Sequence, residues 1–312
     1  MAVKSYKIIV IAVFILFAIV FGILFFGYRA NRVYIPGENI LVIPSERDGF
    51  PVTFIGTTEF MYMGITAVEI PNTVELILSN AFNNNLLTNV EIPGSVVFID
   101  EFAFAENNIK VLTIQYGVNV IGPSAFADNV IETLKLPDSV QHLYPNAFAN
   151  NRITNLRISN SLGRISAGAF VDNMITNIDF GTGVFEIGEV AFANNALETL
   201  VIPDNISRIG RGAFAHNQIS SLTLPNYIVV LVEGVFFGNN LTSVTIPGHV
   251  RAIDRTAFTN NPVTSVSIGE GIIFTGDQNT DVFGMGFEEA YAIHGAGIYT
   301  FSDDVWNWSP PY

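Results

Sequence analysis

The sequence contains no cysteine and few basic residues. Its 312 residues include 14 lysines and arginines against 28 acidic residues, which gives a net charge of −14. Without cysteine, disulfides, thiolate metal ligands, lipid-modified cysteine and cysteine catalysis are excluded. A surface with this excess of negative charge repels polyphosphate, so nucleic acid is not expected as a partner.

Charge is also missing from one long run near the N-terminus. The run from Ile8 to Phe26 is uncharged and almost wholly apolar. As a helix it would span about 28 Å, close to the hydrocarbon thickness of a bilayer. We expect residues 1–33 to form a short cytoplasmic stub and an uncleaved transmembrane signal anchor, with the rest of the chain exported. The alternative is a cleaved signal peptide and a secreted protein, but such a peptide usually has a shorter apolar region, and Phe25 to Tyr28 offer a poor cleavage site.

Phenylalanine recurs at a strictly constant interval through most of the chain, at every twenty-second position. The ten positions are Phe60, Phe82, Phe104, Phe126, Phe148, Phe170, Phe192, Phe214, Phe236 and Phe258. Three residues later comes asparagine in nine consecutive repeats, at Asn85, Asn107, Asn129, Asn151, Asn173, Asn195, Asn217, Asn239 and Asn261. A strict period of this kind is typical of stacked units that bury their apolar faces against each other. We expect each phenylalanine to fill the core and each asparagine amide to bond backbone groups in the adjoining turn.

Each repeat contains a short strand followed by a second apolar segment. In the repeat of Phe214, Leu222 and Leu224 alternate with polar residues, which is the period of a strand with one buried face. Ile228 and Leu231 then predict a second segment, extended or 3₁₀, that faces the same core. Parallel strands stacked at about 4.8 Å through ten repeats would make a solenoid roughly 45–50 Å long.

The repeat also resembles a known family. Residues 197–214, LETLVIPDNISRIGRGAF, are similar to the consensus of the BspA-like leucine-rich repeats, and the resemblance covers about residues 34–275. The repeats of this family have about 22–23 residues. The resemblance implies a leucine-rich-repeat solenoid, mainly β, with parallel stacked strands and short 3₁₀ or helical turns. It further implies a bacterial surface protein with roles in adhesion and protein binding, and it carries no catalytic residues.

The two ends of the array depart from the repeat. Residues 34–60 hold an irregular first repeat with an insertion, which predicts an N-terminal cap, and residues 61–283 hold the regular repeats. The next phenylalanine is expected at position 280, where the chain has Thr280. Residues 284–312 are rich in aromatic side chains and predict a C-terminal cap that covers the open end of the stack. The alternative is a separate recognition module anchored by its two tryptophans.

Binding is expected at side chains that point away from the core and differ between repeats. The ninth position after each phenylalanine lies on the outer face of the strand, and it is charged at Glu91, Lys135, Arg157 and Asp179. A second group has apolar residues where other repeats have polar or small ones, at Tyr227, Val229, Val230 and Phe237. We predict that these residues form a protein-binding face. The alternatives are solubility for the charged row and local core variation for the apolar group.

No constellation of residues indicates catalysis or metal binding. The four histidines, His142, His216, His249 and His294, show no common spacing that would make them a ligand set. The stretch 276–281, GDQNTD, is the nearest approach to a calcium loop, but it lacks the spacing of glycine and glutamate that such a loop needs. We predict no catalytic, cofactor-binding or metal-binding residues and no small-molecule substrate.

Together, these patterns predict a non-enzymatic protein of the cell surface or envelope. The N-terminal helix would attach it to the membrane, and the solenoid would bind a host, matrix or neighbouring-cell protein in adhesion. The alternative is a structural scaffold of the envelope, in which copies of the chain bind each other.

Overall fold

The structure, a computed structural model, describes residues 39–311. The segment predicted to be a cytoplasmic stub and transmembrane anchor, residues 1–33, lies outside the described residues. Within 39–311, no helix has the length and apolar composition needed to cross a bilayer. The described part of the chain comprises all the repeats and most of both flanking segments.

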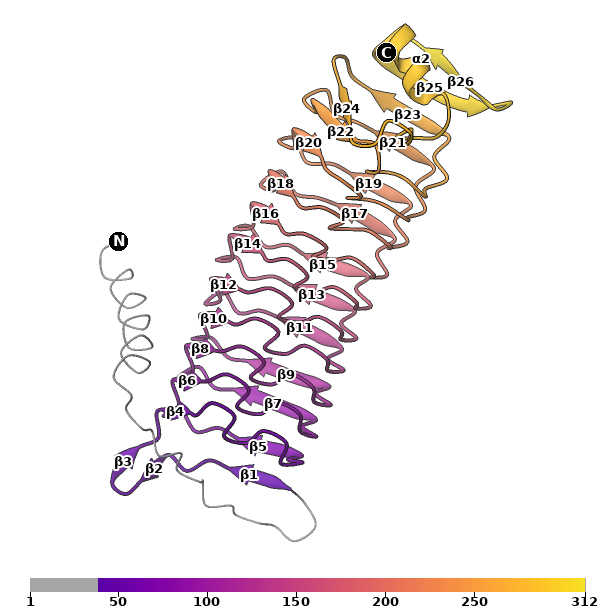
Figure 1. Ribbon diagram of the computed structural model, residues 1–312. Helices are drawn as coiled ribbons and strands as arrows, with labels where there is room; N and C mark the ends of the chain where they lie inside the picture. The colour runs from indigo at the N-terminus through magenta and orange to yellow at the C-terminus, as the bar shows by residue number, and fades with distance from the viewer. Residues whose placement is uncertain (1–38, 312) are drawn as a thin grey trace, which may run out of the picture. The chain divides into compact units, whose positions relative to one another are not determined.

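Two rows of short strands run along the stack (Figure 1). The first row consists of β1 (Ile40–Val42), β5 (Ala67–Glu69), β7 (Asn89–Ile92), β9 (Val111–Ile114), β11 (Thr133–Lys135), β13 (Asn155–Arg157), β15 (Asn177–Asp179), β17 (Thr199–Val201), β19 (Ser221–Thr223), β21 (Ser243–Thr245) and β23 (Ser265–Ile268). The second row consists of β4 (Phe54–Ile55), β6 (Leu76–Ile77), β8 (Phe98–Ile99), β10 (Val120–Ile121), β12 (His142–Leu143), β14 (Arg164–Ile165), β16 (Glu186–Ile187), β18 (Arg208–Ile209), β20 (Val230–Leu231), β22 (Ala252–Asp254) and β24 (Ile273–Thr275). The prediction of a solenoid of parallel stacked strands is confirmed.

Paired strands within each row are parallel and displaced by one coil, apart from a hairpin at the end of the first row. In the first row Leu134 pairs with Leu156, and Leu156 pairs with Ile178. In the second row Ile165 pairs with Ile187. Successive side chains of a strand point to opposite faces, so one position of the repeat faces the core in every coil and the next faces solvent. A surface residue therefore has defined neighbours one repeat away on either side.

The repeated phenylalanines form a continuous stack through the core. From Phe82 to Phe258 their side chains are at most 1% exposed. From Phe60 onward the centroids of successive rings lie 5.0 to 5.9 Å apart. The stack continues beyond the regular repeats, because Phe283 lies on Phe258 at 5.1 Å. Phe283 thus supplies the ring that the regular period would place at position 280, three residues later in the chain.

Each repeated asparagine is close to this stack and bonds two coils. The Oδ1 atom of Asn173 accepts a hydrogen bond from the amide of Ile153 at 3.1 Å. Its Nδ2 atom donates to the carbonyls of Phe148 at 2.9 Å and Phe170 at 3.3 Å. Ile153 and Phe148 belong to the preceding coil, whereas Phe170 belongs to the coil of Asn173. The same bonds recur at Asn85, Asn107, Asn129, Asn151, Asn195, Asn217, Asn239 and Asn261.

The turns that carry the phenylalanines are not the 3₁₀ turns expected from the sequence. Around Phe82, for example, φ is 59° at Asn80 and 55° at Asn84. A 3₁₀-helix needs consecutive residues with negative φ, so these left-handed residues exclude it. The amides of Asn80, Phe82 and Asn84 donate instead to carbonyls of the next coil at 2.8 to 3.0 Å. Among the described residues, the single helix is α2 (Phe287–His294), and the prediction of 3₁₀ turns is wrong.

An antiparallel hairpin accounts for the insertion in the first repeat. Its strands β2 (Glu46–Arg47) and β3 (Phe50–Pro51) pair around Asp48 and Gly49. The φ angles of these two residues are 51° and 81°. Two left-handed residues make the tight turn that matches the twist of paired strands. The hairpin lies between the first strand of the first row and the first strand of the second row.

A second hairpin extends the first row at the C-terminal end. Strand β25 (Gly297–Ser302) pairs antiparallel with β23, and β26 (Val305–Ser309) pairs with β25. Tyr299 of β25 is fully buried. The edge of β23 that would otherwise face solvent is thereby hydrogen-bonded, which removes an open template for strand pairing.

Helix α2 packs on the end of the phenylalanine stack. The ring of Phe287, which is fully buried, lies 4.8 Å from the ring of Phe283. Arg255, which directly follows β22, forms two parallel hydrogen bonds with Glu288, at 2.9 and 2.8 Å. Bidentate pairs of this kind fix orientation as well as adding energy. We propose that residues 284–312 are a cap on the solenoid and not a separate module.

Replacing one repeated asparagine should destabilise the whole solenoid. In Asn173→Ala, three buried backbone groups lose their partner, which costs about 1–3 kcal/mol of unfolding free energy. Urea unfolding of the variant measures this change. The matched control is Asn177→Ala, on the exposed face of β15, which should leave the unfolding free energy nearly unchanged. Equal effects of the two substitutions would contradict the role assigned to Asn173.

The cap proposal predicts that the C-terminal segment and the repeats unfold together. Both tryptophans of the chain lie in this segment, so their fluorescence reports on it while circular dichroism reports on the repeats. We expect the two thermal transitions to coincide. Phe287→Ala should shift both to lower temperature, since removing a buried phenylalanine costs roughly 3–5 kcal/mol. Ile293→Ala, at an exposed position of the same helix, is the control. Tryptophan fluorescence that changes at a separate temperature would support the recognition module instead.

Candidate protein-binding face

The four charged residues predicted for binding lie on the outer face of the first row. Lys135, Arg157 and Asp179 are register partners on the adjacent strands β11, β13 and β15. Glu91 lies on β7, where it pairs with Thr113 of β9. The structure therefore brings three of the four together and leaves Glu91 two strands away from Lys135.

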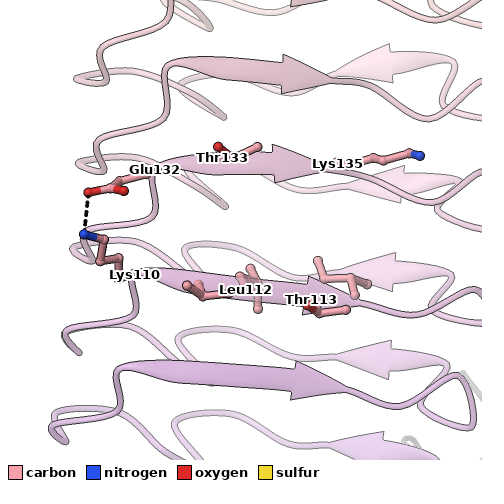
Figure 2. A pocket seen from close by; sticks show the side chains of 8 residues that line it. Lys110, Leu112, Thr113, Glu132, Thr133 and Lys135 are labelled. Atoms are coloured by element: carbon pink, nitrogen blue, oxygen red, sulfur yellow. Dashed lines mark ion pairs between the residues drawn. The ribbon is translucent and has the colours of Figure 1, made fainter.

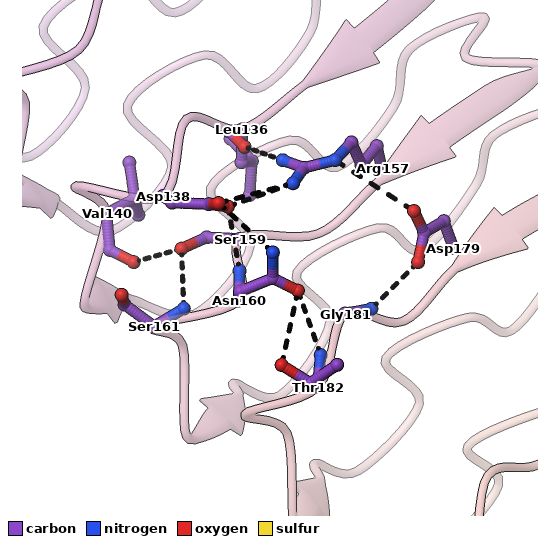
Figure 3. A network of polar contacts seen from close by, with 10 residues as sticks. All are labelled: Leu136, Asp138, Val140, Arg157, Ser159, Asn160, Ser161, Asp179, Gly181 and Thr182. Atoms are coloured by element: carbon purple, nitrogen blue, oxygen red, sulfur yellow. Dashed lines mark hydrogen bonds and ion pairs between the residues drawn. The ribbon is translucent and has the colours of Figure 1, made fainter.

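Arg157 lies between two carboxylates in a network with the loop after β11 (Figure 3). Its Nη2 atom contacts Asp138 at 3.1 Å, and its Nε atom lies 3.9 Å from Asp179. Its Nη1 atom donates to the carbonyl of Leu136 at 3.1 Å. The guanidinium is thus held against the surface by contacts in three directions, and its orientation is fixed before any partner binds.

Asp138 is itself fixed by the next loop of the stack. The backbone amide and the side-chain amide of Asn160 each donate to its carboxylate at 3.0 Å. These two donors, the backbone amide first, lower the pKa of Asp138 below the usual value of an aspartate. The amide of Thr182 in turn donates to Asn160 at 3.0 Å. Three successive loops are therefore linked by side chains beside the charged row.

A hollow of about 360 Å³ lies next to this row, between β9 and β11 (Figure 2). The Lys110 ammonium and the Glu132 carboxylate pair at 3.1 Å on one side of it. Lys135 lines the hollow and extends away from that pair. Among residues 39–311, no carboxylate lies within ion-pair distance of the Lys135 ammonium. Because Arg157 is already paired with Asp138 and Asp179, Lys135 is the unpaired basic residue of this row, and Glu91, further along the face, accepts a hydrogen bond from Gln115.

Toward the C-terminal end, the outer face of the first row is small and polar. From β19 to β23 the two outward positions of each strand carry only serine and threonine, at Ser221, Thr223, Ser243, Thr245, Ser265 and Ser267. Charge on the first row is therefore concentrated on the strands before β17. A partner that recognises charge would bind there, and not along the whole length of the solenoid.

The four apolar residues predicted for binding lie in two different parts of the coil. Tyr227, Val229 and Val230 are exposed, and they occupy the loop after β19 and the start of the second row. Phe237 directly follows the core Phe236 in another part of the coil. It is half-buried, and its ring lies edge-on to His216 with 5.2 Å between centroids. Phe237 thus belongs to the turn that carries the phenylalanine stack, and its grouping with the other three residues stays a prediction.

The polar residues considered for metal binding lie in turns or beside the start of helix α2. His216 has φ of 54° and is one of the left-handed turn residues. Within 39–311, no group of three histidine or acidic side chains could hold a metal ion. In the stretch 276–281, Asp277 accepts a hydrogen bond from the amide of Asn279 at 3.0 Å, which is an Asx-turn. Burial raises the pKa of Asp281, whose carboxylate accepts bonds from the first amides of α2.

One group of surface residues was missed from the sequence. On the second row, Glu186 lies between Arg164 and Arg208 and pairs with both. The residues predicted from the sequence include outward positions of the first strand of each repeat, but at the one outward position of the second strand they include Val230 alone. That position is the sixteenth after each phenylalanine, and reading it along the chain would have shown the three charges in a row.

Parallel coils of constant length around an aliphatic and phenylalanine core define the leucine-rich-repeat class of solenoid proteins. The model of the BspA type leucine-rich repeat region matches residues 53–176 and 163–278, with six copies. The chain belongs to this family of BspA type leucine-rich repeat proteins. No curated protein matches its sequence.

Solved structures of similar proteins come from bacteria. A leucine-rich repeat protein from Bacteroides ovatus is 18% identical with a TM-score of 0.49, over 81% of this chain and 87% of that one. A leucine-rich cell surface protein from Faecalibacterium prausnitzii is 23% identical with a TM-score of 0.43, over 78% of this chain and 91% of that one. At these values the similarities support no argument about function, and family membership rests on the repeat match.

The hydrogen bonds to Asp138 predict a pH dependence of stability. Because its pKa is lower in the folded than in the unfolded chain, its stabilising contribution is present above the unfolded pKa and lost as pH falls through the folded pKa. Asp138→Asn should therefore lower the melting temperature at neutral pH and have little effect in strong acid. Melting temperatures across this pH range measure the difference. Glu198→Gln, at an exposed carboxylate beside the same row, is the control, and an identical pH profile for both variants would contradict the assignment.

Proposed function

We propose that this chain is a membrane-anchored surface or envelope protein whose solenoid binds a protein partner in adhesion. The observation that supports this most is the row formed by Lys135, Arg157 and Asp179 on a rigid outer face. Membership of the leucine-rich-repeat family supports the class of function, since these repeats generally bind proteins. The proposal includes no catalytic step, cofactor or metal.

The charged row has the properties of a prepared binding site. Arg157 is already oriented by Asp138 and Asp179, so a partner does not have to order its side chain. Lys135 is exposed beside it without a carboxylate of its own among the described residues. Complementary charge gives orientation and specificity to an encounter, so we expect the partner to present an acidic residue opposite Lys135.

Anchoring is the second part of the proposal. The apolar run from Ile8 to Phe26 has the length of a bilayer-spanning helix and is followed by the repeats. An uncleaved anchor would export the solenoid and keep it attached to the cell. Cleavage of the same segment would give a secreted protein, and detection of the mature N-terminus by mass spectrometry distinguishes the two.

Charge reversal on the row tests the binding proposal. The full chain is presented to intact cells and to purified extracellular-matrix proteins, and the affinity of each captured protein is measured. Lys135→Glu should weaken binding at least tenfold at physiological salt and reduce its dependence on salt. Arg152→Glu makes the same change of charge at an exposed position off this face and should leave affinity unchanged. A partner that binds both variants equally well would contradict the assignment of this face.

A further inference from the structure

The second row presents one outward side chain per coil, and these side chains form a stripe along the solenoid. We call it the second-row stripe. From β6 to β24 it consists of Leu76, Phe98, Val120, His142, Arg164, Glu186, Arg208, Val230, Ala252 and Ile273. The strands that carry it follow one another in a single row (Figure 1). Phe54 of β4 precedes these ten residues as the register partner of Leu76 and is not part of the stripe. Within the ten, three apolar residues stand at each end, and the polar and charged residues stand in the middle.

Both apolar ends of the stripe are open to solvent. Val230 is 44% exposed and Ile273 is 65% exposed. Leu76, Phe98 and Val120 are partly exposed at the other end. Single exposed apolar residues are ordinary on protein surfaces, but rows of them at both ends of one stripe make a larger surface that favours contact.

The middle of the stripe has an alternating charge order. Glu186 pairs with Arg164 on one side and with Arg208 at 3.7 Å on the other. The two guanidinium groups remain mostly exposed, at 61% and 68% of their side-chain surface. Their remaining hydrogen-bond donors are thus available to a carboxylate from another molecule.

The order of residues in the stripe is complementary to itself when reversed. We call each residue of the stripe a rung. If two copies of the stripe meet antiparallel, the first rung of one copy faces the tenth rung of the other, the second faces the ninth, and so on. Arg164 then faces Glu186 of the second copy, and His142 faces Arg208. The three remaining pairs are apolar on both sides, and they are Val120 with Val230, Phe98 with Ala252, and Leu76 with Ile273.

We infer that two copies of this chain associate through the second-row stripe as an antiparallel dimer with two-fold symmetry. A two-fold interface requires a surface that is complementary to itself, so that residue i contacts residue j and j contacts i. The stripe meets this requirement at its apolar rungs and at its central charge pair. The partner at this face is therefore a second copy of the chain.

The central charges also fix the register of the pair. A displacement by one rung in one direction places Arg164 against its own counterpart. A displacement in the other direction places Glu186 against its counterpart. Like charges in contact cost several kilocalories per mole and exclude wrong registers. One register alone matches apolar to apolar and Arg164 to Glu186.

An exposed aromatic residue lies beside the two-fold axis. Phe185 precedes Glu186, is half-exposed, and has the guanidinium of Arg208 at 5.9 Å from its ring centre. Its ring covers Gly163, where a Cβ atom would lie 2.9 Å from a ring carbon. Aromatic and arginine side chains near the centre of a contact contribute most of the energy of protein interfaces.

The size of the surface suits a dimer. Nine steps of about 4.8 Å make the stripe about 43 Å long, and the five residues 227–231, of which Val230 and Leu231 form the strand, span at most about 16 Å across it. Together these give at most roughly 700 Å² per copy, against the roughly 800 Å² per partner of standard interfaces.

Disulfide crosslinking tests the register directly, because the chain has no cysteine of its own. The full chain carrying both Val120→Cys and Val230→Cys is oxidised in detergent solution and run on a non-reducing gel. These positions are five coils, or about 24 Å, apart in one molecule, too far for an internal disulfide. We expect a disulfide-linked dimer from this variant and monomer from each single variant. The pair Thr113→Cys and Thr223→Cys has the same spacing on the first row and should remain monomeric.

Three results of the crosslinking would overturn the inference. They are no dimer from the paired variant, equal dimer from either single variant, and equal dimer from the control pair on the first row. Protease resistance of each variant shows that it is folded.

Charge reversal provides an independent test by analytical ultracentrifugation of the full chain in detergent. Arg164→Glu should raise the dimer dissociation constant at least tenfold, since it places two acidic residues in contact. Adding Glu186→Arg to the same chain restores opposite charges across the interface and should restore most of the affinity. Val230→Asp should also weaken the dimer, whereas Val201→Asp, at an exposed valine of the first row, should not. Unchanged dissociation constants for Arg164→Glu and Val230→Asp would overturn the inference, and neither result depends on a partner at the charged row.

Discussion

The hydrogen bonds of the repeated asparagines are the constraint on which the solenoid depends. One amide has two donors and one oxygen acceptor, and Asn173 uses them on peptide groups from two successive coils. Those peptide groups are buried, so leaving them unpaired would cost more than any single apolar contact supplies. Each coil is therefore fixed to the one before it at the same place, and the period of the repeat is kept along the stack without interruption. The phenylalanine rings can stack at nearly constant spacing because the amides hold the turns in register.

Because the register is fixed, each outward position of the repeat forms a line of side chains along the solenoid. The side chains on the two rows differ in charge and polarity. On the first row, charge is concentrated around Lys135 and Arg157. Beside them, ion pairs and hydrogen bonds link residues of three successive loops. On the second row, apolar residues flank a short run of opposite charges centred on Glu186. Because both rows are built on the same hydrogen-bonded coils, one surface can change in sequence without disturbing the other. One scaffold can in this way hold two separate contact surfaces.

The regular part of the fold was predictable from the sequence, whereas the turns, the ends and the surface contacts were not. Phenylalanine and asparagine at a fixed period specify stacked coils, since each has one role in the core. The left-handed turns could not be predicted from residue type, because residues such as Phe102 and Val190 adopt a positive φ that their side chains disfavour. Bonds from their amides to the next coil hold them there, and these bonds exist only in the assembled stack. Phe283 restores the ring stack after an irregular loop whose length no period predicts. Among the candidate site residues, alternation along the strand correctly placed Arg157 on the outer face. Its contact with Asp138 depends on a loop conformation that alternation does not describe.

The antiparallel orientation of the proposed dimer links the two candidate functions. It places the first strands of the two solenoids about 53 Å apart along the stack, because each first coil lies one step beyond the ten residues of the stripe. The chain between the apolar run and the first strand, residues 27–39, could reach about 45 Å only when fully extended. This reach is shorter than the separation, so the two copies of a dimer that stands upright on a membrane could not both be anchored in that membrane. Copies anchored in two facing membranes would need no such extension. Self-association through the second row would then be a form of adhesion between cells, and the charged first row would remain free to bind a different protein.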